Sequence, residues 1–195
     1  MRKLVYSMSV SLDGFITNGD GAIDWTAPDE ELHRFHNRQG RETGMHLYGR
    51  RLYEAMAPWE TRDQDPDAPE AELEWAAIWK QLPKVVFSTT LESVEGNARL
   101  VPGDAVAEVA RLKEEPGEGA LAVGGAGLAA SLVRAGLVDE YGLFVYPIVL
   151  GAGTPFFPAL EDRVPLDLVE TRTFGSRVVY LRYAVGRDAP GGRAA

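Results

Sequence analysis

The glycine-rich turn Gly124-Gly125-Ala126-Gly127 is the stretch whose residue types and spacing most clearly indicate chemistry. A short apolar run, 121–123, precedes it, and Leu128 and Leu132 follow at helical spacing. Such a strand, turn and helix start can bind an anion, because free backbone N–H groups and the positive helix end face one point. A dinucleotide pyrophosphate is the usual ligand. The alternative is a tight strand-to-helix connection without a ligand, and the motif alone leaves both open.

The residues near the start of the chain predict a strand over 4–12 and a helix over 29–39. The strand alternates, with one face apolar and the other lined by serines, including Ser9, which suits close approach by a ligand. A loop that ends at Trp25 connects the two elements. The helix has Leu32, Phe35, His36 and Gln39 on one stripe and three acids in its first turn.

Further along, strands are expected at 45–48, 84–91, 121–123, 141–150, 166–173 and 177–185, and helices at 52–56, 70–82, 104–115 and from Gly127. A polar segment, 59–67, is expected to be a mobile loop. The order is β-α repeated four times, followed by strands alone. It predicts an α/β protein with a mostly parallel sheet and an antiparallel C-terminal edge.

Composition limits the classes of function. The chain has 195 residues, which predicts a single domain over 1–187 and a disordered tail over 188–195. A net charge of −9 argues against a nucleic-acid partner, and the absence of cysteine excludes thiolate chemistry. No apolar run suits a membrane span and no signal peptide is evident, so a cytoplasmic protein is expected. Three histidines, His33, His36 and His46, lack a clear third ligand spacing; no metal site is predicted, and core or surface positions are expected for them.

Two motifs carry a resemblance to a known family. They are Ser11-Leu12-Asp13-Gly14-Phe15-Ile16 and the run from 135–140 through Pro147-Ile148-Val149-Leu150-Gly151-Ala152-Gly153. Together with the order of the other elements, they resemble the dihydrofolate reductase-like superfamily over about residues 3 to 185. The nearest resemblance is to the C-terminal reductase domain of the riboflavin-biosynthesis deaminase–reductase and its stand-alone relatives. It implies a three-layer αβα fold and an NADPH-dependent reduction of a small pyrimidine, pterin or carbonyl compound, similar to 5-amino-6-(5-phosphoribosylamino)uracil reductase.

The resemblance also implies a cofactor site made by three segments that lie far apart in the sequence. Gly49, Arg50 and Arg51 match the turn that meets the phosphates of NADPH, which suits the fork-shaped donors of arginine. Ser88 and Thr89 match a strand end in the same region, and Gly124, Gly125, Ala126 and Gly127 match the pyrophosphate turn. A solvated basic turn and a polar strand terminus are the alternatives for the first two segments.

For the proton that must accompany the hydride, two acids are candidates. Glu31 falls where dihydrofolate reductases place an active-site carboxylate, and it shares a helical face with Phe35, so the two could flank a substrate ring. Apolar walls would raise the pKa of that carboxyl. The alternative for Glu31 is a complement to the helix dipole. Asp13 is the second candidate acid, and Ser9, Trp25 and Phe35 are the candidate substrate contacts.

The chain also departs from its relatives on the substrate side. Leu52, Ala129 and Val145 replace residues expected in dihydrofolate reductases, and 50–60 lacks the Asp-Asp-Pro-type segment of the riboflavin enzymes. Two alternatives therefore stay open, a non-catalytic dinucleotide-binding scaffold and a true dihydrofolate reductase. The resemblance further implies a homodimer, and the strand 141–150 with its flanks is the expected interface.

Overall fold

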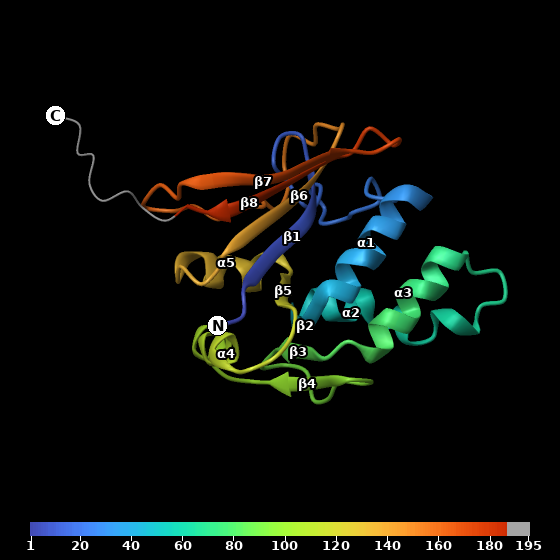
Figure 1. Ribbon diagram of the computed structural model, residues 1–195, viewed down its shortest axis with the longest axis horizontal. Coiled ribbons are helices and arrows are strands. Elements are labelled where there is room, and N and C mark those ends of the chain that lie inside the picture. The colour runs from blue at the N-terminus through green and yellow to red at the C-terminus, as the bar shows by residue number, and fades with distance from the viewer. Residues whose placement is uncertain (187–195) are drawn as a thin grey trace.

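The alternating apolar pattern near the N-terminus produces the strand at the centre of the sheet. The computed structural model describes residues 1–186, whose strands form one eight-stranded sheet in the order β4-β3-β2-β5-β1-β6-β8-β7 (Figure 1). The strands are β1 (Leu4–Ser11), β2 (Thr43–Gly49), β3 (Lys84–Phe87), β4 (Ala98–Val101), β5 (Ala120–Gly124), β6 (Glu140–Tyr146), β7 (Leu166–Thr173) and β8 (Val179–Val185).

Six of these strands run parallel to their neighbours, and β8 and β7 form an antiparallel C-terminal edge. The predicted α/β class and the predicted mixture of strand directions are therefore confirmed. Parallel neighbours place the carboxyl ends of β1, β2, β3 and β5 at one edge of the sheet, which is where ligands bind in open α/β sheets.

Helices cover both faces of the sheet and give it three layers (Figure 1). One face carries α1 (Glu30–Glu42), α2 (Arg50–Met56) and α3 (Glu70–Gln81), and the other carries α4 (Ala105–Glu114) and α5 (Ala126–Arg134). The predicted αβα arrangement is thus confirmed. Side-chain caps fix two helix starts, because Asp29 accepts from the Leu32 amide and Asp104 from the Val106 amide.

Three apolar clusters hold these layers together. The largest joins α4 and α5 to the sheet through residues such as Leu4, Tyr6, Leu121 and Leu132. A second cluster packs α1 on β6 and β8, and a third packs α2 and α3 on β2 and β3. Trp75 and Trp79 of α3 belong to the third cluster, so they are core residues.

Several predicted boundaries change. β1 stops at Ser11 because the chain turns at Gly14, which has φ of 91°, and Leu12 is 67% exposed. β6 stops at Tyr146, directly before a proline that cannot donate to the ladder. The segment expected to be a loop contains two short 3₁₀ helices, η1 (Ala57–Glu60) and η2 (Arg62–Gln64). β4, a short and half-buried edge strand, was not predicted. The tail expected over 188–195 lies outside the described residues.

Candidate active site

A cavity of about 620 Å³ lies between α1 and the middle of the sheet. Its floor comes from β1, β2 and β5, and it includes Ser7, Ser9, His46, Tyr48 and Gly124. Ser9 is thereby placed on the wall, on the serine face of β1. The remaining wall is largely apolar or aromatic and includes Ile16, Leu52, Met56, Trp59, Trp75 and Phe144. A mostly apolar concave site with few polar groups is the usual form of a small-molecule site.

Helix α1 presents one side to this cavity through His33, His36, Gln39 and Gly40. These positions are spaced three, three and one apart, so they form one stripe of the helix. The ring of His36 packs against Phe144, with 4.3 Å between the ring centroids. The sequence analysis expected ordinary core or surface positions for the histidines and did not predict that they line a cavity. The position of His36 on the predicted inward stripe of the helix could have indicated it.

The cavity histidines are kept neutral by their surroundings. Burial, reinforced by the charge of His33, lowers the pKa of His36 to about 4. Burial, reinforced by the charge of Lys84, lowers the pKa of His46 to about 3. Both histidines are half-buried. Protein atoms surround most of each ring, and the accessible part of the ring faces the cavity. Near neutral pH each imidazole therefore has one N–H donor and one acceptor nitrogen.

His46 is joined to Tyr48, two residues along β2, by a hydrogen bond between His46 Nδ1 and the phenol oxygen. Burial raises the pKa of Tyr48, so its hydroxyl stays protonated. Gln39 and Tyr180, which also line the cavity, are hydrogen-bonded to each other: Gln39 Nε2 donates to the Tyr180 hydroxyl over 2.9 Å.

Glu31 does not border this cavity. Its carboxylate accepts from Arg172 Nη2 over 2.8 Å and from the Gly175 amide over 3.0 Å, and it is exposed to solvent. The amide of Gly175 and the guanidinium of Arg172 lower the pKa of Glu31. The expectation of apolar walls and a raised pKa is wrong, because the carboxylate faces the β7–β8 connection instead of the sheet.

Asp13 is also exposed and lies outside the cavity wall. It accepts from Ser11 Oγ over 2.7 Å, from the Gly151 amide over 2.7 Å and from the Leu150 amide over 3.1 Å. These hydrogen bonds, that of Ser11 first, lower the pKa of Asp13 to about 2. The carboxylate connects the turn after β1 to the loop after β6, so its contacts are those of a positioning residue.

Phe35 and Trp25 lie beside the cavity and do not line it. Phe35 packs in the second apolar cluster, 5.0 Å from the ring of Tyr180 and 5.2 Å from that of Phe174. The pairing of Phe35 with Glu31 around one substrate ring is therefore not found. Trp25 packs edge-on to Tyr146 at 5.6 Å, while Thr26, the next residue, is part of the wall.

The three segments expected to bind the cofactor meet at the carboxyl edge of the sheet. Gly49 pairs with Phe87, so Ser88 and Thr89 follow directly beside it. A Cβ atom on Gly49 would lie 3.7 Å from Leu128 Cβ, next to the glycine-rich turn. A Cβ on Gly124 would lie 2.4 Å from Leu52 Cδ2, so the end of the Leu52 side chain of α2 lies directly against this turn.

The glycine-rich turn itself leaves room for a ligand. Gly125 has φ of 94° and starts α5 without a side-chain cap. A Cβ atom on Gly127 would meet nothing within 4 Å, and Arg50 and Arg51 nearby are exposed. Arg50 has a loose ion pair with Glu54, 3.8 Å apart, and remains available to an anion. These donors and this open space fit the phosphates of a dinucleotide.

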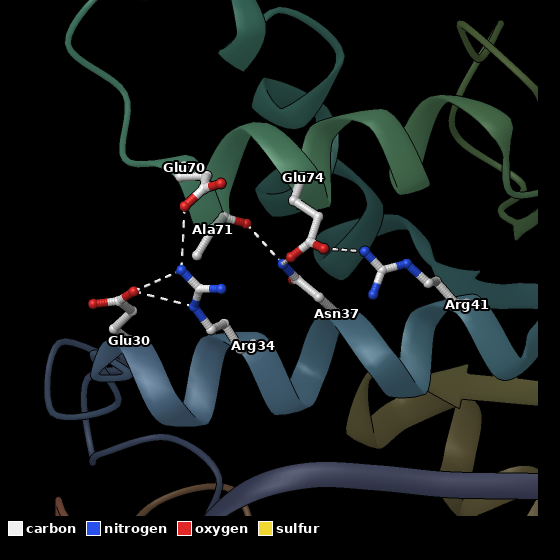
Figure 2. A network of polar contacts seen from close by, with 7 residues as sticks. All are labelled: Glu30, Arg34, Asn37, Arg41, Glu70, Ala71 and Glu74. Atoms are coloured by element: carbon white, nitrogen blue, oxygen red, sulfur yellow. Dashed lines mark hydrogen bonds and ion pairs between the residues drawn. The ribbon is translucent and has the colours of Figure 1, made fainter.

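A line of polar contacts joins the outer side of α1 to α3 (Figure 2). Arg34 Nη2 bonds to Glu30 over 2.8 Å and to Glu70 over 3.2 Å. Asn37, fully buried, donates from Nδ2 to the Ala71 carbonyl over 2.8 Å and also to Glu74. Arg41 completes this α1–α3 seam with an ion pair to Glu74. The seam fixes α1 above the sheet and so fixes the roof of the cavity.

Within residues 1–186, no three His, Asp or Glu side chains are grouped so that they could hold a metal ion. In the same part of the chain, no helix has the length and apolar character needed to cross a bilayer.

Comparison with known proteins identifies the family. The model of the RibD C-terminal domain matches residues 2–180. The chain belongs to the RibD C-terminal domain family. Bacillus subtilis (strain 168) YyaP is 35% identical to this RibD C-terminal domain protein over 184 residues, which cover 93% of this chain and 94% of YyaP.

Solved structures confirm the reductase-like fold of this RibD C-terminal domain. A candidate riboflavin biosynthesis protein from Shewanella sp. PV-4 has a TM-score of 0.71 at 22% identity, covering 96% of this chain and all of that one. Dihydrofolate reductase from Enterococcus faecalis, solved in complex with NADP(H), has a TM-score of 0.62 at 14% identity, covering 95% and 97%. The resemblance to both groups is confirmed, and the family supports a function of the reductase type.

Proposed function

We propose that this chain is an NADPH-dependent reductase that transfers a hydride to a carbonyl or C=N bond of a small molecule in the cavity. The observation that carries the proposal is the position of Gly124, which ends β5, opens the glycine-rich turn and also lines the cavity. A dinucleotide on the turn can therefore extend one end into the space where a substrate would lie.

Different segments of the chain would contact different parts of the cofactor and the substrate. Gly125, Ala126 and Gly127 would offer backbone N–H groups to the pyrophosphate. Gly49, Arg50, Arg51, Ser88 and Thr89 would meet the additional phosphate that distinguishes NADPH from NADH. When bound, NADPH would supply the hydride. The apolar wall under α1 would exclude water and hold the substrate flat against the sheet, with Ser9 beside it.

Neither predicted acid supports a role as proton donor, because Glu31 and Asp13 are exposed, ion-paired or hydrogen-bonded outside the cavity, and have lowered pKa values. The histidines of the cavity and its serine, threonine and tyrosine hydroxyls are groups on the wall that can donate a proton. The proton would therefore come from one of these groups or from water.

The test is a titration with NADPH followed by cofactor fluorescence, with NADH as the comparison. We expect NADPH to bind much more tightly than NADH, and Arg50→Ala to remove most of that difference. Glu54→Ala is the matched control, because it removes the partner of Arg50 and leaves the guanidinium in place. If NADPH does not bind to the wild type, the reductase proposal fails and the non-catalytic scaffold becomes the better account.

We also propose a homodimer. The expected strand cannot supply an edge, because β6 is paired with both β1 and β8. Support comes instead from exposed apolar side chains on β7 and on the segment before it, namely Phe157, Leu160, Val164, Leu166, Leu168 and Val169. Light scattering after size exclusion tests this, with Leu168→Asp expected to shift a dimer toward the monomer. The cytoplasmic location stays a prediction.

A further inference from the structure

The interior of the cavity has no unpaired charge. Of the side chains on its wall, Arg182 and Glu42 are the charged ones beside the neutral histidines. Arg182 is held by Glu140, with 2.7 Å between Nη2 and Oε2. Glu42 is exposed, at the last residue of α1. A phosphate or carboxylate that entered the cavity would therefore lose its water without gaining a countercharge, which is costly.

Most polar groups of the wall are already used within the protein. Gln39 bonds to Tyr180, Thr43 Oγ1 donates to the Gln39 carbonyl, and His46 bonds to Tyr48. Ser7, whose Oγ is buried, and the rings of His33 and His36 have no hydrogen-bond partner among residues 1–186. Of the two rings, that of His36 is the more deeply enclosed, and Phe144 covers one side of it. A polar group inside protein without a partner indicates a place where a ligand completes the hydrogen bond.

The position of His36 also suits the proposed chemistry. Phe144 pairs with Ser9 in the sheet, so His36 lies above the carboxyl half of β1. Gly124 follows Val123, which pairs with Tyr6 of the same strand. Gly124 therefore lies beside the middle of β1, two residues before Ser9, and both Gly124 and His36 border the cavity, so a ring between them can meet both.

We propose that the cavity binds an uncharged ring compound with a carbonyl group, and that His36 hydrogen-bonds the carbonyl oxygen. This inference rests on the proposed reductase function and names its substrate class. In the reduction, the carbonyl carbon would gain a hydride with its electron pair, which leaves NADP⁺ from NADPH. The C=O π pair would move to oxygen, and that oxygen would take a proton from water, which leaves hydroxide. The N–H of His36 stabilises the negative charge that develops on oxygen.

The test uses two ligands of equal size that differ in charge, 6-acetyl-2-naphthamide and 6-acetyl-2-naphthoate, measured by isothermal titration calorimetry. We expect the amide to bind at least tenfold more tightly than the carboxylate. His36→Ala is expected to weaken the amide about five- to tenfold, the effect of one lost hydrogen bond. His36→Gln keeps a donor and is expected to recover much of that loss.

Arg38→Ala is the control, because Arg38 lies on α1, is exposed, and packs on Phe35 away from the cavity. It should leave the affinity for the amide unchanged. NADPH titrations of the same proteins separate this inference from the reductase proposal. If NADPH binds and the carboxylate binds as tightly as the amide, or if His36→Ala and His36→Gln both keep wild-type affinity for the amide, the inference is overturned. Should His36→Ala fail to fold, the wild-type ligand pair and His36→Gln still decide.

Discussion

Gly40 of α1 lies against the indole of Trp75 in α3, so closely that a Cβ atom on Gly40 would be 2.5 Å from Trp75 Cζ3. Both residues border the cavity, and Ile78 Cγ2 would be 3.2 Å from the same Cβ. The absence of a side chain at position 40 therefore sets how near the two helices come, and with it the width of the cavity roof.

Substituting Gly40 with alanine tests this contact. Alanine favours a helix interior by about 1 kcal/mol over glycine, so propensity alone predicts a more stable protein. We expect the opposite, a loss of about 2 kcal/mol in the free energy of unfolding, because the methyl group must displace the Trp75 ring. Urea denaturation measures it. Gly127→Ala in α5, where a Cβ meets nothing within 4 Å, is the matched control and should not lose stability. A Gly40→Ala protein as stable as that control would contradict the expectation.

Asn37 is expected to be the strongest member of the α1–α3 seam. Asn37→Ala leaves the Ala71 carbonyl and the Glu74 carboxylate without a buried donor, which should cost about 2 kcal/mol of stability. Arg34→Ala removes two exposed ion pairs, to Glu30 and Glu70, and should cost less than about 1 kcal/mol. Thermal and urea unfolding of the two variants measure both losses of stability. If the two variants lose the same free energy of unfolding, the burial of Asn37 does not explain its contribution.

The cavity histidines predict a loss of stability in weak acid. Their pKa values are lowered in the folded protein, to about 4 for His36 and about 3 for His46, while the unfolded chain has ordinary values near 6.5. The unfolded state therefore binds more protons below pH 6.5. The free energy of unfolding should fall there by up to about 1.4 kcal/mol per pH unit for each histidine, and change little above it.

Urea unfolding at pH 7.5, 6.0 and 5.0 measures this dependence. Carboxylates with lowered pKa values, such as Asp13 and Glu108, begin to reduce stability only near pH 5, where the unfolded carboxyls start to bind protons, so the change between pH 7.5 and 6.0 reports the histidines. His36→Asn should reduce the slope between pH 6.5 and 5 and leave stability at pH 7.5 nearly unchanged. The same slope in the variant and the wild type would mean that His36 is not neutral in the folded protein.

Methotrexate is expected not to bind. Its diaminopteridine ring is recognised best by a buried carboxylate, and the carboxylates of Glu31 and Asp13 are directed away from the cavity. A calorimetric titration at 100 µM protein, a concentration of the order needed to detect weak binding, should give no heat beyond dilution. Tight binding, or displacement of bound dihydrofolate, would instead favour the alternative of a true dihydrofolate reductase.

Much of the fold follows from local patterns in the sequence. The starts of α1 and α4 near Asp29 and Asp104, the glycine-rich turn and the alternating strand β1 all lie close to their predicted places. β4 escaped prediction because it has only four residues, too few to show an apolar alternation, although Leu100 and Val101 pack against the core. The candidate site was harder to predict. The inward stripe of α1 includes both Phe35 and His36. The packing of α1 against α3 and on β8 decides that the histidine meets the cavity and the phenylalanine does not.

The central strand has a consequence for how the chain folds. Leu4 pairs with Leu121, and Val5 pairs with Glu140, so β1 has no partner until more than a hundred further residues have been made. Pairing between strands that are distant in sequence makes folding slow. The entropy cost of closing the long connecting loop comes before the strand contacts that offset it. During synthesis the serine and apolar faces of β1 stay unprotected from other chains. Mutations in β5 or β6 should therefore reduce the yield of folded protein more than their effect on final stability would indicate.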